Sequence, residues 1–185
     1  MPEDRLTLTV SLKTPDNEAR SALEALRVKM GLGATVSGLD REDVWEFGLA
    51  DGGRCVGDIK RVVESTNLFA NPNKHRCAFK PGAASDVTLG ANQLDILVSD
   101  RERAESESIL SSLRRLGVRG VVDARHWVRW RVTLEFSLAP SKPDLSSLIG
   151  SIAVANAREG GLFCNPHIER ATAVLPWGEE KALAR

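Results

Sequence analysis

The chain carries one short motif twice, and this internal repeat constrains the fold more than any other feature. Residues 68–73 (Leu-Phe-Ala-Asn-Pro-Asn) return as residues 162–167 (Leu-Phe-Cys-Asn-Pro-His), about 94 positions later (163 − 69). In both places a helix-like apolar run precedes the Leu-Phe pair, and a strand-like run follows the Asn-Pro pair. A spacing of this length is that of a small domain and not of a solenoid repeat. We therefore expect two related units in tandem.

Composition excludes several classes of protein. Acidic and basic residues balance at 25 each, which argues against nonspecific nucleic-acid binding because that needs a basic surface. The three cysteines are too few and too irregularly spaced for a disulfide framework and indicate reduced thiols. The N-terminal residues contain no apolar signal-peptide core, and no apolar run approaches the roughly 20 residues that span a bilayer. We expect a soluble, cytoplasmic protein with no membrane partner.

The first repeat has the pattern of a split βαβ motif. Residues 6–12 alternate between apolar and polar, which is typical of a half-buried strand. Apolar residues at helical spacing follow over residues 19–30. The sequence then predicts two separate strands, a second helix and a last strand, giving the order strand, helix, strand, strand, helix, strand. These four later elements are expected near residues 34–40 and 43–49, from Cys55 to Phe69, and over residues 73–80.

The same pattern restarts after residues 81–92, which have the composition of a linker. A strand is expected at residues 94–98 and a helix at 106–116, followed by a segment at 118–123 that matches residues 34–40. A long strand from about 127 to 138, a second helix from Leu145 and a closing strand near 167–175 complete the repeat. The distance between equivalent aspartates is about 83 (123 − 40), against 94 for the Asn-Pro motif, so the second repeat contains an insertion of roughly ten residues before its second helix. Insertions collect in exposed loops.

These patterns predict an α+β protein with two ferredoxin-like (βαββαβ) units in tandem, forming an intramolecular pseudo-dimer. Repeat 1 is expected at residues 1–80 and repeat 2 at residues 93–178, with a linker at 81–92 and a tail at 179–185.

The repeated motifs resemble the PurS family, the small subunit of phosphoribosylformylglycinamidine synthase in de novo purine (IMP) biosynthesis. Residues 8–13 (Leu-Thr-Val-Ser-Leu-Lys) are similar to the V-x-V-x-L-K first strand of that family, and residues 69–72 to its L-A-N-P-type helix end. Residues 162–169 are close to its N-P-x-I-E ending. The family also has an L-D-P-x-G-like segment after the lysine, of which residues 14–17 keep only Pro-Asp and residues 99–101 keep neither lysine nor proline.

The resemblance implies a non-catalytic subunit that bridges a glutaminase subunit and an ATP-dependent synthetase subunit for ammonia transfer. It implies no cofactor on this chain, since ATP, magnesium and glutamine would bind to the partner subunits. A tandem chain would replace the family's dimer, because a covalent link turns subunit association into an intramolecular event. The matched partner-binding candidates are Lys13 at the strand end and the two motifs Asn71-Pro72 and Asn165-Pro166, although the Asn-Pro pairs also suit a helix end and turn.

Two other surfaces have a functional and a structural interpretation. Arg129 and Arg131 alternate with apolar residues on a predicted strand, which indicates a solvated face, a partner or phosphate contact, or a basic–aromatic nucleic-acid surface. His75 and Cys77, together with Cys164 and His167, are four zinc-type ligands at equivalent places in the repeats, but neither pair has the usual C-x-x-C or H-x-x-x-H spacing. We therefore expect no metal site and treat these four residues as weak candidates.

No catalytic constellation is evident in the sequence, which lacks a G-x-x-x-x-G-K-[ST] phosphate-binding loop. We expect no complete active site on this chain. The alternative function is an ACT-like tandem regulatory domain that binds a small metabolite, since tandem ferredoxin-like units also build amino-acid-sensing modules.

Overall fold

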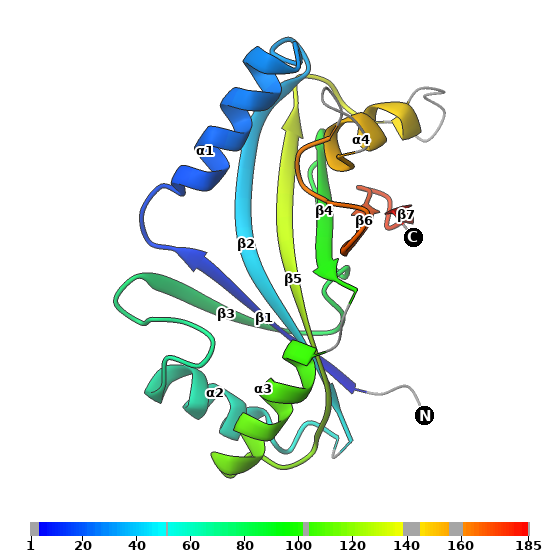
Figure 1. Ribbon diagram of the computed structural model, residues 1–185. Coiled ribbons are helices and arrows are strands. Elements are labelled where there is room, and N and C mark those ends of the chain that lie inside the picture. Colours follow the sequence, from blue (N-terminus) through cyan, green and yellow to red (C-terminus); the bar gives the residue numbers. More distant parts are fainter. Residues whose placement is uncertain (1–3, 51, 102–103, 139–144, 156–160, 185) are drawn as a thin grey trace. The chain divides into compact units, whose positions relative to one another are not determined.

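The computed structural model describes residues 4–50, 52–101, 104–138, 145–155 and 161–184, and within them the protein is α+β (Figure 1). The strands form an antiparallel sheet of seven strands in the order β3-β1-β2-β5-β4-β6-β7. None of the described helices is long and apolar enough to cross a bilayer. The strands are β1 (Asp4–Leu12), β2 (Val36–Leu49), β3 (His75–Pro81), β4 (Gln93–Asp100), β5 (Val121–Leu134), β6 (Glu169–Val174) and β7 (Glu180–Ala184). The helices are α1 (Asn17–Glu24), its π-helical continuation η1 (Ala25–Lys29), α2 (Val56–Ser65), α3 (Ala104–Arg115) and α4 (Leu145–Ala153).

The chain divides into two compact units whose segments alternate along the sequence. Unit 1 consists of Met1–Thr14, Glu42–Asp86 and Glu102–Trp127, and unit 2 of the remaining residues. Helix α1 of the predicted first repeat therefore belongs to unit 2, whereas α3 of the predicted second repeat belongs to unit 1. The strands β2 and β5 each contribute one part to each unit.

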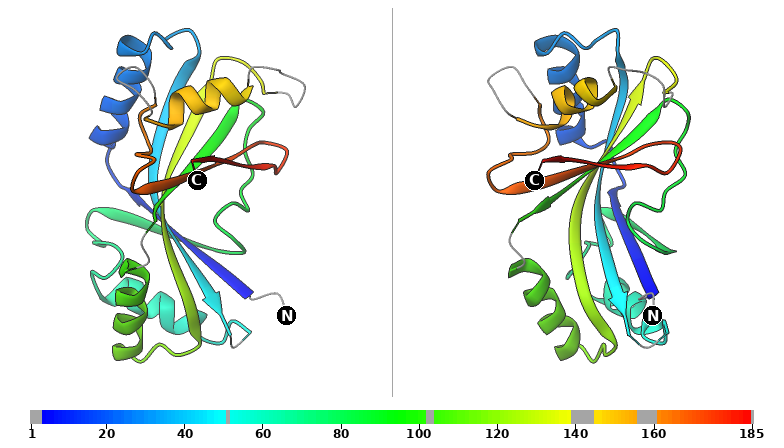
Figure 2. Two further views of the ribbon diagram at one scale, coloured as in Figure 1. Left: turned by 45° about the vertical axis from the view of Figure 1, so that its right-hand side comes forward. Right: turned by 90° about the vertical axis from the view of Figure 1, so that its right-hand side faces the viewer.

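Unit 1 places two helices, α2 and α3, on one apolar core, and both views of Figure 2 show these helices close together. The core takes its helical residues from both predicted repeats because the inward positions of α3, Ile109 and Leu113, cluster with those of α2. Its buried members are Leu6, Leu8, Val10, Trp45, Phe47, Leu49, Cys55, Ile59, Val62, Val63, Ala70, Ile109, Leu113, Val118, Val121 and Ala124.

Unit 2 has the corresponding arrangement, with α1 and α4 over β4, β6 and the second part of β5. Asp16 caps α1, because its Oδ1 accepts hydrogen bonds from the backbone N–H groups of Glu18 (2.7 Å) and Ala19 (3.2 Å). Fully buried members of this core include Leu26, Leu94, Ile96, Leu134, Ile149 and Ile152.

Several sequence-based expectations about element boundaries were wrong. The two strands expected at 34–40 and 43–49 are one continuous strand, β2. Gly38, within this strand, lies close to β5, since a Cβ there would be 3.3 Å from the Cβ of Thr133. The helix expected to reach Phe69 ends at Ser65, because Thr66 is extended (φ −133°) and its hydroxyl donates to Val62 O (2.7 Å).

The C-terminal half shows two further differences. Strand β5 begins at Val121 and runs to Leu134, so the segment 118–123 and the long strand expected from about 127 form mostly one element. The predicted tail contains β7, which pairs with β6. The insertion expected before the second helix of the second repeat falls partly on residues 139–144, which lie outside the described residues.

Candidate functional site

The Asn-Pro motif of unit 1 forms a turn that is held from several sides. The Oδ1 of Asn71 accepts from the N–H of Asn73 (2.9 Å), and the Asn71 carbonyl accepts from the N–H of His75 (2.8 Å). The ammonium group of Lys13 donates to the carbonyl of Pro72 (2.7 Å). The structure therefore brings Lys13, Asn71 and Pro72 together at one end of the β1–β3 pair.

The Asn-Pro motif of unit 2 has the same construction. The Oδ1 of Asn165 accepts from the N–H of His167 (3.1 Å), and its carbonyl accepts from the N–H of Glu169 (2.8 Å). The Nη2 of Arg101 donates to the carbonyl of Pro166 (2.8 Å). Each unit thus presents an Asn-Pro turn whose proline carbonyl is bound by a cation from the end of the first strand of its own repeat.

Arg101 is the counterpart of Lys13 and was not among the residues predicted from the sequence. The backbone hydrogen bonds of the two residues are also equivalent: the N–H of Lys13 donates to Lys74 O and the N–H of Arg101 donates to Ile168 O, both at 2.9 Å. The two cations are 88 positions apart (101 − 13) and not 94, so the motif spacing does not align them. An alignment on the first strands would have found the pair, because each cation follows the last inward valine, Val10 or Val98, by three residues.

A side chain from the following strand supports each turn. His75 Nδ1 accepts from the N–H of Asn71 (2.9 Å), and Glu169 Oε2 accepts from the N–H of Asn165 (2.6 Å). His75 and Glu169 are 94 positions apart (169 − 75) and begin β3 and β6. Different side chains therefore satisfy the same backbone group at equivalent places.

Aromatic contacts fix the segment before each turn to its sheet. Phe69 packs edge-on against Trp45 (5.2 Å between ring centroids, 74°), and Phe163 stacks on Trp130 (4.5 Å, 20°). Both phenylalanines belong to the repeated Leu-Phe motif. Their contacts with the tryptophans explain why the motif has an aromatic residue at this position.

Each tryptophan also contacts a residue from the opposite repeat. His126 stacks on Trp45 (4.5 Å, 22°), and the guanidinium carbon of Arg41 lies 5.8 Å from the ring centroid of Trp130. His126 and Arg41 lie on β5 and β2, in the parts of these strands that each repeat contributes to the opposite unit.

Arg129 and Arg131 converge on one fully buried carboxylate. The guanidinium of Arg131 donates to both oxygens of Asp95 (2.8 and 2.9 Å), and Arg129 Nε lies 3.3 Å from Asp95 Oδ2. Asp95 is 0 % exposed and Arg129 is 4 % exposed. Strand alternation predicts a solvated face for both arginines, and this is wrong for Arg129, because Asp95 draws it into a buried ion-pair network. A partner contact through Arg131 stays a prediction.

The four weak metal-ligand candidates are divided between the units. His75 and Cys77 lie in unit 1, and Cys164 and His167 lie in unit 2. Within the residues that the structure describes, no group of three or more His, Cys, Asp or Glu side chains is arranged to hold a metal ion. Burial raises the pKa of the Cys77 thiol, and burial followed by the nearby Glu169 carboxylate raises the pKa of Cys164, against a smaller opposing effect of Arg101. Protonated thiols are poor metal ligands.

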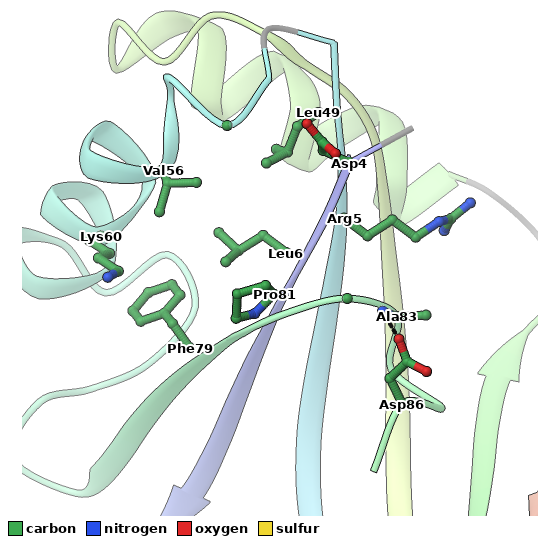
Figure 3. Close-up of a pocket in the computed structure, with 12 residues that line it drawn as sticks. Asp4, Arg5, Leu6, Leu49, Val56, Lys60, Phe79, Pro81, Ala83 and Asp86 are labelled. Carbon is green, nitrogen blue, oxygen red and sulfur yellow. Dashed lines mark hydrogen bonds between the residues drawn. The ribbon is translucent and has the colours of Figure 1, made fainter. Parts of the chain in front are cut away.

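Unit 1 also contains a cavity of about 570 Å³ between α2 and the start of β1 (Figure 3). Leu6, Val56 and Phe79 form part of its apolar wall, and Figure 3 shows Lys60 beside the Phe79 ring. The Lys60 ammonium lies 5.5 Å from the centroid of that ring. On the far side, Asp86 accepts from the N–H of Ala83 (3.3 Å). The sequence analysis did not predict this cavity, because its lining comes from segments that lie far apart in the chain.

Comparison with protein-family models, curated proteins and solved structures gives no significant match to the chain. Function must therefore be inferred from the geometry of its own residues. That geometry includes two equivalent hydrogen-bonded turns and a cavity in unit 1. Rigid turns with satisfied backbone groups suit recognition of another protein, because little conformational entropy is lost when they bind.

Proposed function

We propose that this chain is a non-catalytic scaffold subunit that binds two larger proteins through its equivalent Asn-Pro turns. The observation that carries the proposal is the pair of cation–carbonyl contacts, Lys13 to Pro72 and Arg101 to Pro166, in corresponding places of the two units. A homodimer would present one turn twice in identical form. Here the cations differ, and so do the supporting residues His75 and Glu169, so that each turn can be specific for its own partner.

At the level of the fold, the proposal is a duplicated ferredoxin-like unit with a reciprocal exchange. Unit 1 combines β1, α2, β3 and the end of β2 with α3 and the start of β5. Unit 2 combines β4, α4, β6 and the end of β5 with α1 and the start of β2. Each set has the elements of one βαββαβ unit, with its first helix and second strand supplied by the other repeat. Such an exchange would explain why Trp45 and Trp130 contact residues of the opposite repeat.

At the level of the pathway, we propose a PurS-like subunit of phosphoribosylformylglycinamidine synthase. The sequence resemblance in the first strand and in both Asn-Pro motifs supports this assignment. In that role the chain would organise a glutaminase and an ATP-dependent synthetase so that ammonia from glutamine reaches the synthetase. Glutamine hydrolysis, ATP and magnesium binding would belong to the partners.

The test is affinity purification of the full-length chain from native lysate of its source, followed by an amidation assay with formylglycinamide ribonucleotide. The scaffold proposal predicts that a glutaminase and an ATP-dependent synthetase copurify with the chain. It also predicts that removing the chain abolishes glutamine-dependent activity while activity with added ammonium salt persists, because only ammonia transfer needs the bridge. Loss of neither activity, with neither partner recovered, would refute the proposal.

Single charge removals test the two turns separately. Lys13→Met and Arg101→Met each remove the bond to one proline carbonyl, and we expect each to weaken the binding of a different partner by about tenfold, the equivalent of about 1.4 kcal/mol. Lys29→Met is the matched control, since Lys29 is an exposed cation at the end of η1 and belongs to neither Asn-Pro motif. Equal effects of all three substitutions would argue against specific roles for the turns.

The cavity of unit 1 supports a second candidate, the binding of a small metabolite by an ACT-like tandem regulatory domain. Its apolar wall and the Lys60 ammonium suit an apolar molecule with a carboxylate. A ligand present at 100 times its Kd should stabilise the folded chain by about 2.7 kcal/mol. Thermal melts with individual amino acids and other carboxylates test this, and a Lys60→Met variant should lose the stabilisation.

A further inference from the structure

The two units differ at the outer edge of their sheets. Strand β6 of unit 2 pairs on its outer side with β7, through Ala171, Ala173 and neighbouring residues. Strand β3 is the corresponding strand of unit 1, yet it ends the sheet, and no strand lies beyond it in the described part of the chain. In the described part of the chain, no strand thus takes the position beside β3 that β7 takes beside β6 (Figure 1).

The backbone of β3 offers hydrogen-bonding groups on this open side. Lys74 O accepts from the N–H of Lys13, and the N–H of Gly82 donates to Arg5 O, so these residues point toward β1. Residues along a strand alternate in the direction of their peptide groups. Cys77 and Phe79 must therefore direct their N–H and C=O groups outward. They are the counterparts of Ala171 and Ala173, which β7 covers in unit 2 (171 − 77 = 94; 173 − 79 = 94).

Charge on the edge decides what can pair there. Lys74, Arg76 and Lys80 are all exposed and lie at alternate positions of this segment. In an antiparallel pair of two β3 strands these cations would face one another, and like charges directly opposite are destabilising. A second copy of the chain is therefore disfavoured, whereas an extended segment with acidic residues at alternate positions is complementary.

The cavity described above supplies an anchoring place beside the same edge. Phe79 and Pro81 belong to β3 and line the cavity together with Val56 and Lys60 of α2 (Figure 3). A side chain on this face of an added strand would lie toward the cavity. In unit 2, Leu183 of β7 packs against the core in the corresponding way. The favoured occupant therefore alternates acidic residues with apolar ones.

We propose that the outer edge of β3 is a strand-addition site for an extended, acidic–apolar segment of a partner protein. The segment pairs with Cys77 and Phe79 through its backbone, contacts Arg76 with its carboxylates, and places an apolar side chain in the cavity. This is the β-augmentation mode of recognition, in which main-chain bonds supply affinity and alternate side chains supply specificity. The proposed contacts, with Cys77, Phe79 and Arg76, do not involve Lys13, Asn71 or Pro72, so the proposal does not rest on the scaffold assignment.

The test uses the full-length chain and a fluorescent seven-residue peptide, acetyl-Glu-Val-Glu-Leu-Glu-Val-Glu-amide, followed by anisotropy and by amide hydrogen exchange in NMR spectra. We expect saturable binding and new protection of the Cys77 and Phe79 amides. The amides of Arg76 and Ala78 should change little, because their alternation places them in bonds with β1. A peptide with lysine in place of glutamate should bind at least tenfold more weakly.

Charge-reversal variants supply the matched control. Lys74→Glu with Arg76→Glu should weaken peptide binding at least tenfold, whereas Arg20→Glu with Lys29→Glu, an equal change on exposed positions of α1 and η1, should leave it within twofold. These substitutions leave the backbone pairing of β3 intact. The proposal is overturned if no binding occurs at millimolar peptide or if both variants respond equally. It is also overturned if the peptide protects amides of β6 from exchange. The same holds if the amides of Cys77 and Phe79 are already protected without peptide because the chain self-associates.

Discussion

The buried carboxylate of Asp95, with Arg129 and Arg131 beside it, allows the burial of this ion-pair network to be tested by a single substitution. Asp95→Ala removes both hydrogen bonds from Arg131 and the close charge beside Arg129. Removing one partner of a buried pair typically costs 3–5 kcal/mol, because the remaining charge loses its compensation inside the protein. The Arg131 side chain is 28 % exposed and can regain water, but Arg129 is 4 % exposed and cannot. We therefore expect a loss near the lower end of this range, about 3 kcal/mol.

An exposed aspartate–arginine pair serves as the control. Asp58 and Arg61 form an i,i+3 pair on α2 at 2.8 Å, with side chains 46 % and 63 % exposed. Asp58→Ala should cost only about 0.3–0.5 kcal/mol, since water screens such pairs. The comparison separates burial from the simple loss of a carboxylate.

Urea unfolding measures both free energies, followed by circular dichroism and by tryptophan fluorescence to check that the transitions coincide. Asp95→Ala should lower the midpoint strongly with an unchanged dependence on urea, as expected for a change in stability alone. A loss below about 1 kcal/mol, or one equal to that of Asp58→Ala, would refute the buried network and would leave Arg129 and Arg131 available to partners.

Three further predictions concern the exchange of helices, the thiols and a helix cap. In double-mutant cycles measured by urea unfolding, Leu26→Ala and Ile149→Ala should show an interaction energy of about 0.5 kcal/mol or more, because both residues belong to the core of unit 2. The effects of Leu26→Ala and Ile59→Ala should add independently, because Ile59 belongs to the core of unit 1. Coupling of Leu26 with Ile59 and not with Ile149 would contradict the exchange of helices. Cys77 is the exposed cysteine, so it should react first with a disulfide reagent. Because partial burial raises the pKa of the Cys77 thiol, its reaction rate at neutral pH should lie below that of a model thiol. The rate should continue to increase as the pH rises above the ordinary pKa of a thiol, and a rate that levels off near pH 7 would contradict this. Asp16→Ala should cost about 1 kcal/mol by loss of the α1 cap, and a change under 0.3 kcal/mol in the same urea assay would show the cap is dispensable.

The part of the candidate site that lies in the short Asn-Pro motifs could be predicted from the sequence. Asn71, Pro72 and Lys13 do lie together, because β1 and β3 of one repeat pair and bring the end of β1 beside the turn before β3. Arg101 was not predicted, because 64 positions separate it from Asn165 (165 − 101), whereas 58 separate Lys13 from Asn71 (71 − 13). The buried position of Arg129 was also missed, since strand alternation assigns a face but not what covers it.

The sequence by itself determined the α+β class, most strands and helices, and the equivalence of the two Asn-Pro turns. These follow from local periodicity and capping, which nearby residues control. Only the tertiary structure decided that α1 and α3 pack in the units of the opposite repeats, that β2 and β5 run without a break, and that β7 completes one sheet edge while β3 ends the other. The apolar face of a helix shows that the helix must be buried on that side. Because the hydrophobic effect is non-directional, the face does not specify which sheet the helix packs against.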